Sequence, residues 1–128
     1  MTGLLWCLVY ATFLPIVWGI AGGTFRARAP EGFDNNTPRR QAASLTGVGE
    51  RLYGAQQNAW EALAMFTPAV FVATITGVEG SAATTTGLVF CVARTLHGLA
   101  YATNLATLRS LIWFVGVGAT IYLFVLAA

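Results

Sequence analysis

The sequence contains no lysine and very little charge of any kind. Of its 128 residues, 9% are charged and 56% are hydrophobic, whereas soluble domains carry about 25% charged residues. The net charge is only +2, which leaves no broad basic patch of the kind that binds nucleic acid. This composition excludes nucleic acid as a partner and favours a protein whose solvent is a lipid bilayer.

Cysteine is also scarce. The chain has two cysteines, Cys7 and Cys91, and each lies within an apolar run. A disulfide framework or a metal site needs more ligands at closer spacing. We therefore expect no disulfide framework and no metal.

Long apolar segments make up most of the chain, and about 20 apolar residues suffice to cross the hydrocarbon core of a bilayer. The first segment lacks the basic start of a cleaved signal peptide, so we interpret it as a spanning helix that Pro15 kinks. The pattern predicts one domain over residues 1–128, with a polar loop at 24–45. Its helices are expected at about 3–23, 46–77, 82–104 and 108–127.

Arginine is distributed asymmetrically among the loops. If four helices run up and down, the first and third loops share one side of the membrane, and the opposite side holds only Glu79. Arginine-rich loops face the cytoplasm. We therefore expect an all-α integral membrane protein, a four-helix transmembrane up-and-down bundle with both termini on the non-cytoplasmic side. Six arginines lie on the cytoplasmic side: Arg26, Arg28, Arg39, Arg40, Arg51 and Arg109.

Two expected helices carry polar stripes with the same spacing. Positions i, i+3, i+7 and i+10 share one helix face, and lipid would penalise polar side chains there, so the two stripes should face each other. The first stripe is Arg51, Gly54, Asn58 and Glu61. The second is Arg94, His97, Tyr101 and Asn104.

The depth of these residues predicts a cleft that opens towards the cytoplasm. Glu61 and Arg94 reach similar depths from opposite ends of their helices, so we expect an ion pair between them at the floor. A cationic mouth, amides midway and a buried carboxylate suit a small peptide-like anion. Above the floor, the expected lining is Asn58, Gln57, Arg51, Tyr101 and His97.

Structural roles for the same residues stay open. Intramembrane polar groups also hold helices together, which for Glu61 and Arg94 is as good an explanation as ligand contact. Arg51 is also explained as an interfacial arginine and Tyr101 as part of an aromatic belt. For His97 we favour a packing role. The last pair, Arg109 and Ser110, also suits a positive anchor with an N-cap at the head of the final helix.

Two motifs resemble the MAPEG family, the membrane-associated proteins in eicosanoid and glutathione metabolism, and most closely its small bacterial branch. The first is E-R-x-x-G-A-Q-Q-N-x-x-E at 50–61, followed by Pro68. The second is A-R-T-L-H-G-L-A-Y-x-x-N-L-A-T-L-R-S-L at 93–111. The resemblance implies homotrimers that bind glutathione in a cytoplasm-facing cleft between subunits, in the bacterial inner membrane.

The resemblance also implies roles for single residues. Arg109 matches the arginine that stabilises the glutathione thiolate in active members, and Ser110 falls where the prostaglandin E synthases have a serine. Gly54 departs from the pattern, because better-known members have a second arginine there. His97 stands where leukotriene C synthase has a tyrosine. The glutathione contacts match Arg51, Asn58, Glu61, Arg94 and Tyr101.

Two functions follow as competing hypotheses. The first is a glutathione-dependent transferase or peroxidase-like enzyme that acts on small lipophilic electrophiles from the bilayer. The second is a catalytically silent structural or accessory subunit of a larger membrane complex. A transporter is disfavoured, because the four short spans contain no internal repeat and no paired broken helices.

Overall fold

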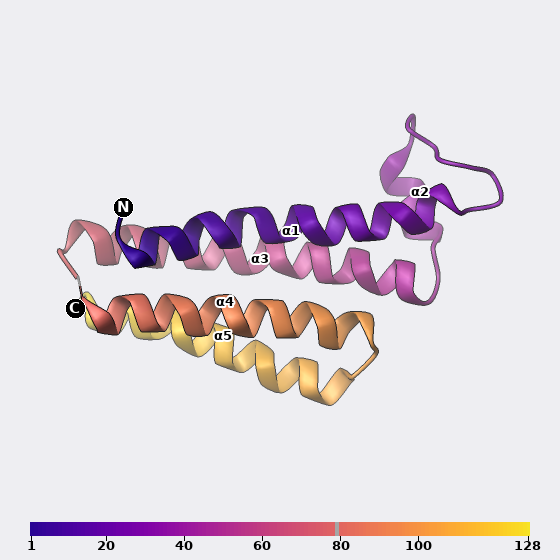
Figure 1. Cartoon of the computed structure of the whole chain (residues 1–128). Helices are drawn as coiled ribbons and strands as arrows, with labels where there is room; N and C mark the ends of the chain where they lie inside the picture. Colours follow the sequence, from indigo (N-terminus) through magenta and orange to yellow (C-terminus); the bar gives the residue numbers. More distant parts are fainter. Residues whose placement is uncertain (79) are drawn as a thin grey trace.

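The computed structural model describes residues 1–78 and 80–128, and within them every regular element is a helix. Glu79, the one acidic residue expected on the non-cytoplasmic side, lies outside the described residues. Four long helices lie side by side (Figure 1), with α1 against α3 and α4, and α5 against α3 and α4. Both termini lie at one end, and the short α2 lies at the other. The helices are α1 (Gly3–Ala27), α2 (Pro38–Ser44), α3 (Val48–Ile75), α4 (Ser81–Ala102) and α5 (Ala106–Leu126).

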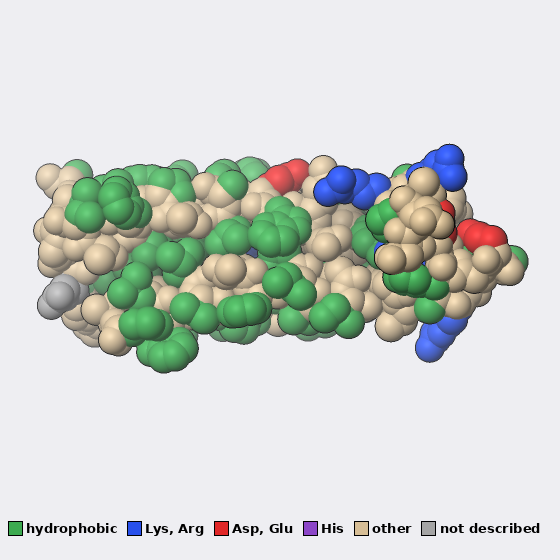
Figure 2. All heavy atoms as spheres, turned by 90° about the horizontal axis from the view of Figure 1, so that it is seen from above, with side chains coloured by type: hydrophobic (Ala, Val, Ile, Leu, Met, Phe, Trp, Pro, Cys, Tyr) green, Lys and Arg blue, Asp and Glu red, His purple; other side chains and the backbone are tan. Residues whose placement is uncertain are grey.

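Three of the described helices, α1, α3 and α5, are long and apolar enough to cross a membrane. Hydrophobic side chains cover much of the length of the face in Figure 2, and charged side chains gather towards the end that carries α2. The remaining long helix, α4, carries three consecutive threonines as well as Arg94 and His97. Helices α1, α3 and α5 all pack on α4, and Thr86, Arg94 and His97 are buried there, whereas Thr85 is exposed. The crossing expected at 82–104 stays a prediction.

Small residues and one aromatic pair hold the long helices together. The buried face of α3 is mostly alanine, which lets neighbouring backbones approach closely. Phe66 of α3 stacks on Phe90 of α4 with ring centroids 3.8 Å apart. A Cβ atom at Gly98 would collide with the indole of Trp18, so the contact between α1 and α4 depends on that glycine.

The segment expected as a polar loop at 24–45 is folded. The first helix continues to Ala27, and α2 occupies Pro38–Ser44. Arg26 is buried, and its Nε donates to Gln41 Oε1 at 3.0 Å. The same oxygen accepts the backbone N–H of Asp34 at 3.0 Å, and Gln41 Nε2 donates to Gly32 O at 2.6 Å. Arg26 therefore anchors this segment to the end of α1, a role that charge counting does not reveal.

Asp34 closes the turn before α2, and we predict that it titrates at unusually low pH. Its carboxylate accepts the hydroxyl and the backbone N–H of Thr37 and the backbone N–H of Asn36. These bonds favour the charged form and hold the pKa of Asp34 below its ordinary value of 3.8. A carboxyl group whose pKa is lower in the folded protein than in the unfolded chain stabilises the fold at any pH above the unfolded-state pKa. This stabilisation is lost as the pH falls through the folded-state pKa.

The amide NMR shifts of Asn36 and Thr37 measure this titration. We expect a midpoint below 3.8 and no such titration in Asp34→Asn, which has no ionisable group at this position. A midpoint at or above the ordinary value would show that the turn does not bind the carboxylate.

Candidate functional site

A cavity of about 350 Å³ opens between α3, α4 and α5. It contains five of the residues singled out from the sequence, and it adds two aromatic side chains of α5 that sequence reasoning missed. Trp113 and Phe114 pack edge to face with ring centroids 5.2 Å apart, about one helical turn beyond Arg109 and Ser110. Their position one helical turn after Arg109 and Ser110 is the feature of the sequence that could have identified them as lining residues. The lining is Asn58, His97, Tyr101, Arg109, Ser110, Trp113 and Phe114.

Beside this cavity, Arg94 takes part in a polar chain rather than an ion pair. The expected ion pair between Glu61 and Arg94, both described residues, is wrong, because Asn58 lies between them. Arg94 Nη2 donates to the backbone oxygen of Asn58 at 3.4 Å and to its Oδ1. Asn58 Nδ2 in turn donates to Glu61 Oε2 at 3.2 Å. The amide thus bridges the two charged groups, while Arg94 Nε is buried without a hydrogen-bond partner among the described residues and Glu61 remains exposed.

The side chain of Tyr101 on α4 lies against both α3 and α5. The guanidinium carbon of Arg109 is 4.3 Å from the centroid of its ring, a distance at which a cation is attracted to an aromatic face. A Cβ atom at Gly54 would lie only 2.7 Å from the Cζ atom and the hydroxyl oxygen of Tyr101. Gly54 therefore leaves the space that Tyr101 fills, and Tyr101 in turn supports Arg109.

Ser110 lies within the second turn of α5, so the N-cap interpretation of this residue is wrong. Leu105 occupies the N-cap position and makes no side-chain cap hydrogen bond. The Ser110 hydroxyl donates to Ala106 O at 3.1 Å, which leaves its oxygen lone pairs available to accept a hydrogen bond in the cavity.

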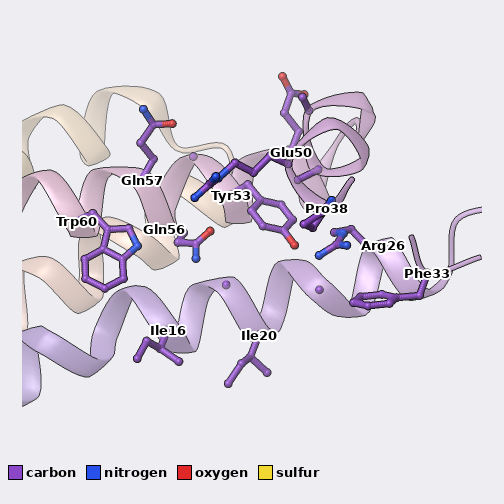
Figure 3. Close-up of a pocket in the computed structure, with 16 residues that line it drawn as sticks. Ile16, Ile20, Arg26, Phe33, Pro38, Glu50, Tyr53, Gln56, Gln57 and Trp60 are labelled. Carbon is purple, nitrogen blue, oxygen red and sulfur yellow. The ribbon is translucent and has the colours of Figure 1, made fainter. Parts of the chain in front are cut away.

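Two expected lining residues lie elsewhere. Arg51 Nε donates to Ala102 O at 3.0 Å, at the C-terminal end of α4, where a cation is favourable. Gln57 lines a separate groove of about 980 Å³ between α1, α2 and α3. Figure 3 shows this groove with Ile16 and Ile20 on α1, and with Gln57 and Trp60 on α3.

Of the residues that the structure describes, Arg109 is the one arginine that lines the cavity, and its side chain is half-buried. A cation beside a thiol favours the thiolate, which is the nucleophilic form. The aromatic side chains of α5 offer an apolar surface next to that cation. Within the described residues, no group of three or more His, Cys, Asp or Glu side chains is arranged to hold a metal ion.

Comparison with protein families gives one match. The model described as "MAPEG family" matches residues 3–128, nearly the whole chain. No curated protein and no solved structure gives a significant match.

Proposed function

The chain belongs to the MAPEG family of membrane proteins, and from this premise we propose that it binds glutathione beside Arg109 and conjugates it, through its sulfur, to lipophilic electrophiles. The observation that carries the proposal is the cavity itself, which places Arg109 and Ser110 of α5 next to Asn58, His97 and Tyr101. Its volume of about 350 Å³ falls at the lower end of the range typical of small-molecule sites.

In the proposed reaction, Arg109 stabilises the thiolate as the thiol proton passes to solvent. The sulfur then attacks the electrophilic carbon, a C–S bond forms, and the leaving group departs with the electron pair of its bond to carbon. Phe114 is 65% exposed and, with Trp113, offers the apolar surface on which a lipophilic electrophile would lie. Such a substrate would arrive from the bilayer.

We further propose that the four long helices all cross a bacterial inner membrane, with both termini on the non-cytoplasmic side. The end of the molecule that carries α2 then faces the cytoplasm, as its arginines favour. The partners would be the bilayer and two further copies of the chain in a homotrimer. The groove lined by Gln57 offers a surface against which an adjacent subunit would pack.

A second candidate function is a silent accessory subunit of a larger membrane complex. Two observations favour it: Arg51 is engaged with Ala102 O, and Gly54 supplies no cation. Both features reduce the positive charge available to the carboxylates of glutathione.

Conjugation of glutathione with a lipophilic chloronitrobenzene by the purified protein tests the enzyme hypothesis. We expect saturable product formation that depends on both substrates and is lost when the protein is heat-denatured. Product formation at the uncatalysed rate, together with co-purification of a large membrane complex, would favour the accessory subunit instead.

A further inference from the structure

The two cysteines of the chain meet where α1 packs on α4. Cys7 and Cys91 are both free and buried. The Cys91 thiol donates to the backbone oxygen of Cys7, with Sγ and O 3.6 Å apart. The two thiol groups are also within hydrogen-bonding reach of each other. The fold thus pairs two thiols that lie 84 residues apart in the sequence.

Gly87 allows the close approach of these side chains. It lies one helical turn before Cys91 on the same face of α4. A Cβ atom at Gly87 would lie 2.9 Å from Cys7 Sγ and 3.1 Å from Cys7 Cβ. Because Gly87 has no side chain, Cys7 packs directly against α4. A disulfide requires this closeness, since its two Cβ atoms are about 3.8 Å apart.

A cavity of about 570 Å³ opens beside the pair, and both cysteines line it. Trp6, Leu88 and Val92 also line it, and their side chains are exposed. The cavity therefore opens on the outer face of α1 and α4, which meets lipid when these helices cross a bilayer. Among the described residues, none lines both this cavity and the one between α3, α4 and α5.

A pair of hydroxyl groups borders the same cavity, one turn beyond each cysteine. Thr95 Oγ1 donates to Cys91 O at 2.9 Å. This bond uses the single hydroxyl proton of Thr95, so Tyr10 donates to Thr95 Oγ1 at 2.5 Å. The Tyr10 oxygen keeps lone pairs that can accept the O–H of a molecule in the cavity. The cavity therefore suits an apolar molecule that carries an O–H group.

We propose that Cys7 and Cys91 are a site of oxidation, at which a lipophilic hydroperoxide from the bilayer converts the two thiols into a disulfide that ties α1 to α4. A hydroperoxide is an apolar molecule with an O–H group, as the cavity requires, and its O–O bond is the oxidant. The product is one crosslink between two helices, not the disulfide framework that the sequence excludes. In the proposed orientation, Cys7 lies near the non-cytoplasmic end of α1, and the bacterial periplasm on that side favours disulfides.

The oxidation proceeds in two balanced steps. One cysteine sulfur attacks the terminal oxygen of the hydroperoxide, an S–O bond forms and the O–O bond breaks. The organic oxygen leaves with the electron pair, takes the thiol proton and becomes an alcohol. The second cysteine sulfur then attacks the sulfenic sulfur, the S–S bond forms and the S–O bond breaks. The departing hydroxide takes the second thiol proton and becomes water.

Treating the reduced, purified protein in lipid bilayer discs with cumene hydroperoxide tests the proposal. We expect the intact protein to lose two hydrogen atoms and one cumyl alcohol to form for each disulfide. Peptide mapping should find Cys7 joined to Cys91 within one chain, and dithiothreitol should restore both thiols. In Cys7→Ser and Cys91→Ser, the remaining thiol should stop at the sulfenic acid, which dimedone traps. Free thiols in the treated, folded protein, or a disulfide only between chains, would overturn the proposal.

Two valines of α4 provide a matched test of entry from the lipid side. Both are exposed, but Val92 lines the cavity beside the cysteines and Val89 does not. Val92→Trp should slow disulfide formation by cumene hydroperoxide severalfold, because the indole occupies the mouth of the cavity. Val89→Trp should leave the rate unchanged. Equal rates in these two variants would contradict entry of the oxidant through this cavity.

Discussion

Replacing Arg109 with alanine is expected to lower the conjugation rate about 100-fold or more, the usual effect of removing one preorganised charge stabiliser. Arg109 provides the cation that borders the cavity. Its guanidinium stacks on the Tyr101 ring, with the guanidinium carbon 4.3 Å from the ring centroid. Because the side chain is only half-buried, its loss should change turnover much more than stability. Steady-state kinetics and thermal unfolding measured on the same preparation separate the two effects.

A matched control is available for this substitution. Arg28 also lies near an aromatic ring, with its guanidinium carbon 5.9 Å from the Phe25 centroid, but it is exposed and lies outside the cavity. Arg28→Ala should leave the rate unchanged, and Arg109→Lys should keep part of the activity because it keeps a charge. An Arg109→Ala variant with unimpaired turnover would exclude this residue from thiolate stabilisation.

Introducing the arginine that better-known family members have at position 54 is expected to damage the site rather than improve it. Any side chain there places Cβ 2.7 Å from the ring and hydroxyl of Tyr101, so Tyr101 must move and take its support away from Arg109. Overpacking of this kind costs about 1–3 kcal/mol. Both Gly54→Ala and Gly54→Arg should lower the unfolding temperature and weaken glutathione binding.

Gly118 offers the comparison, because a Cβ atom there would meet nothing within 4 Å. Gly118→Ala should be neutral or slightly stabilising, since alanine is the better helix former. The double variant Gly54→Ala with Tyr101→Leu should regain most of the lost stability, because the smaller side chain relieves the collision. A Gly54→Arg variant that folds normally and binds glutathione more tightly would contradict the packing of Tyr101 described above.

Helical spacing in the sequence predicts which residues of α3 and α4 line the same cavity. The two stripes bring Asn58 of α3 to the same cavity as His97 and Tyr101 of α4. Gln57 belongs to a different groove because adjacent helical residues point about 100° apart. A stripe therefore identifies one face of a helix, and a flanking residue need not share it.

Side-chain geometry and long-range partners account for what the sequence did not reveal. Similar depth for Glu61 and Arg94 indicated proximity, but whether they touch depends on side-chain conformations that place the Asn58 amide between them. The folded segment around α2 depends on Gln41 reaching Arg26, fifteen residues earlier in the chain. Composition alone makes that segment look like an unstructured polar loop.

Ultraviolet absorbance of the glutathione thiolate tests the central claim most directly. Titrating the purified protein with glutathione at neutral pH should produce a saturable thiolate band, and the band should be absent in Arg109→Ala. No binding at millimolar glutathione, or a band of equal size in Arg109→Ala, would contradict a thiolate held beside Arg109 in the cavity between α3, α4 and α5.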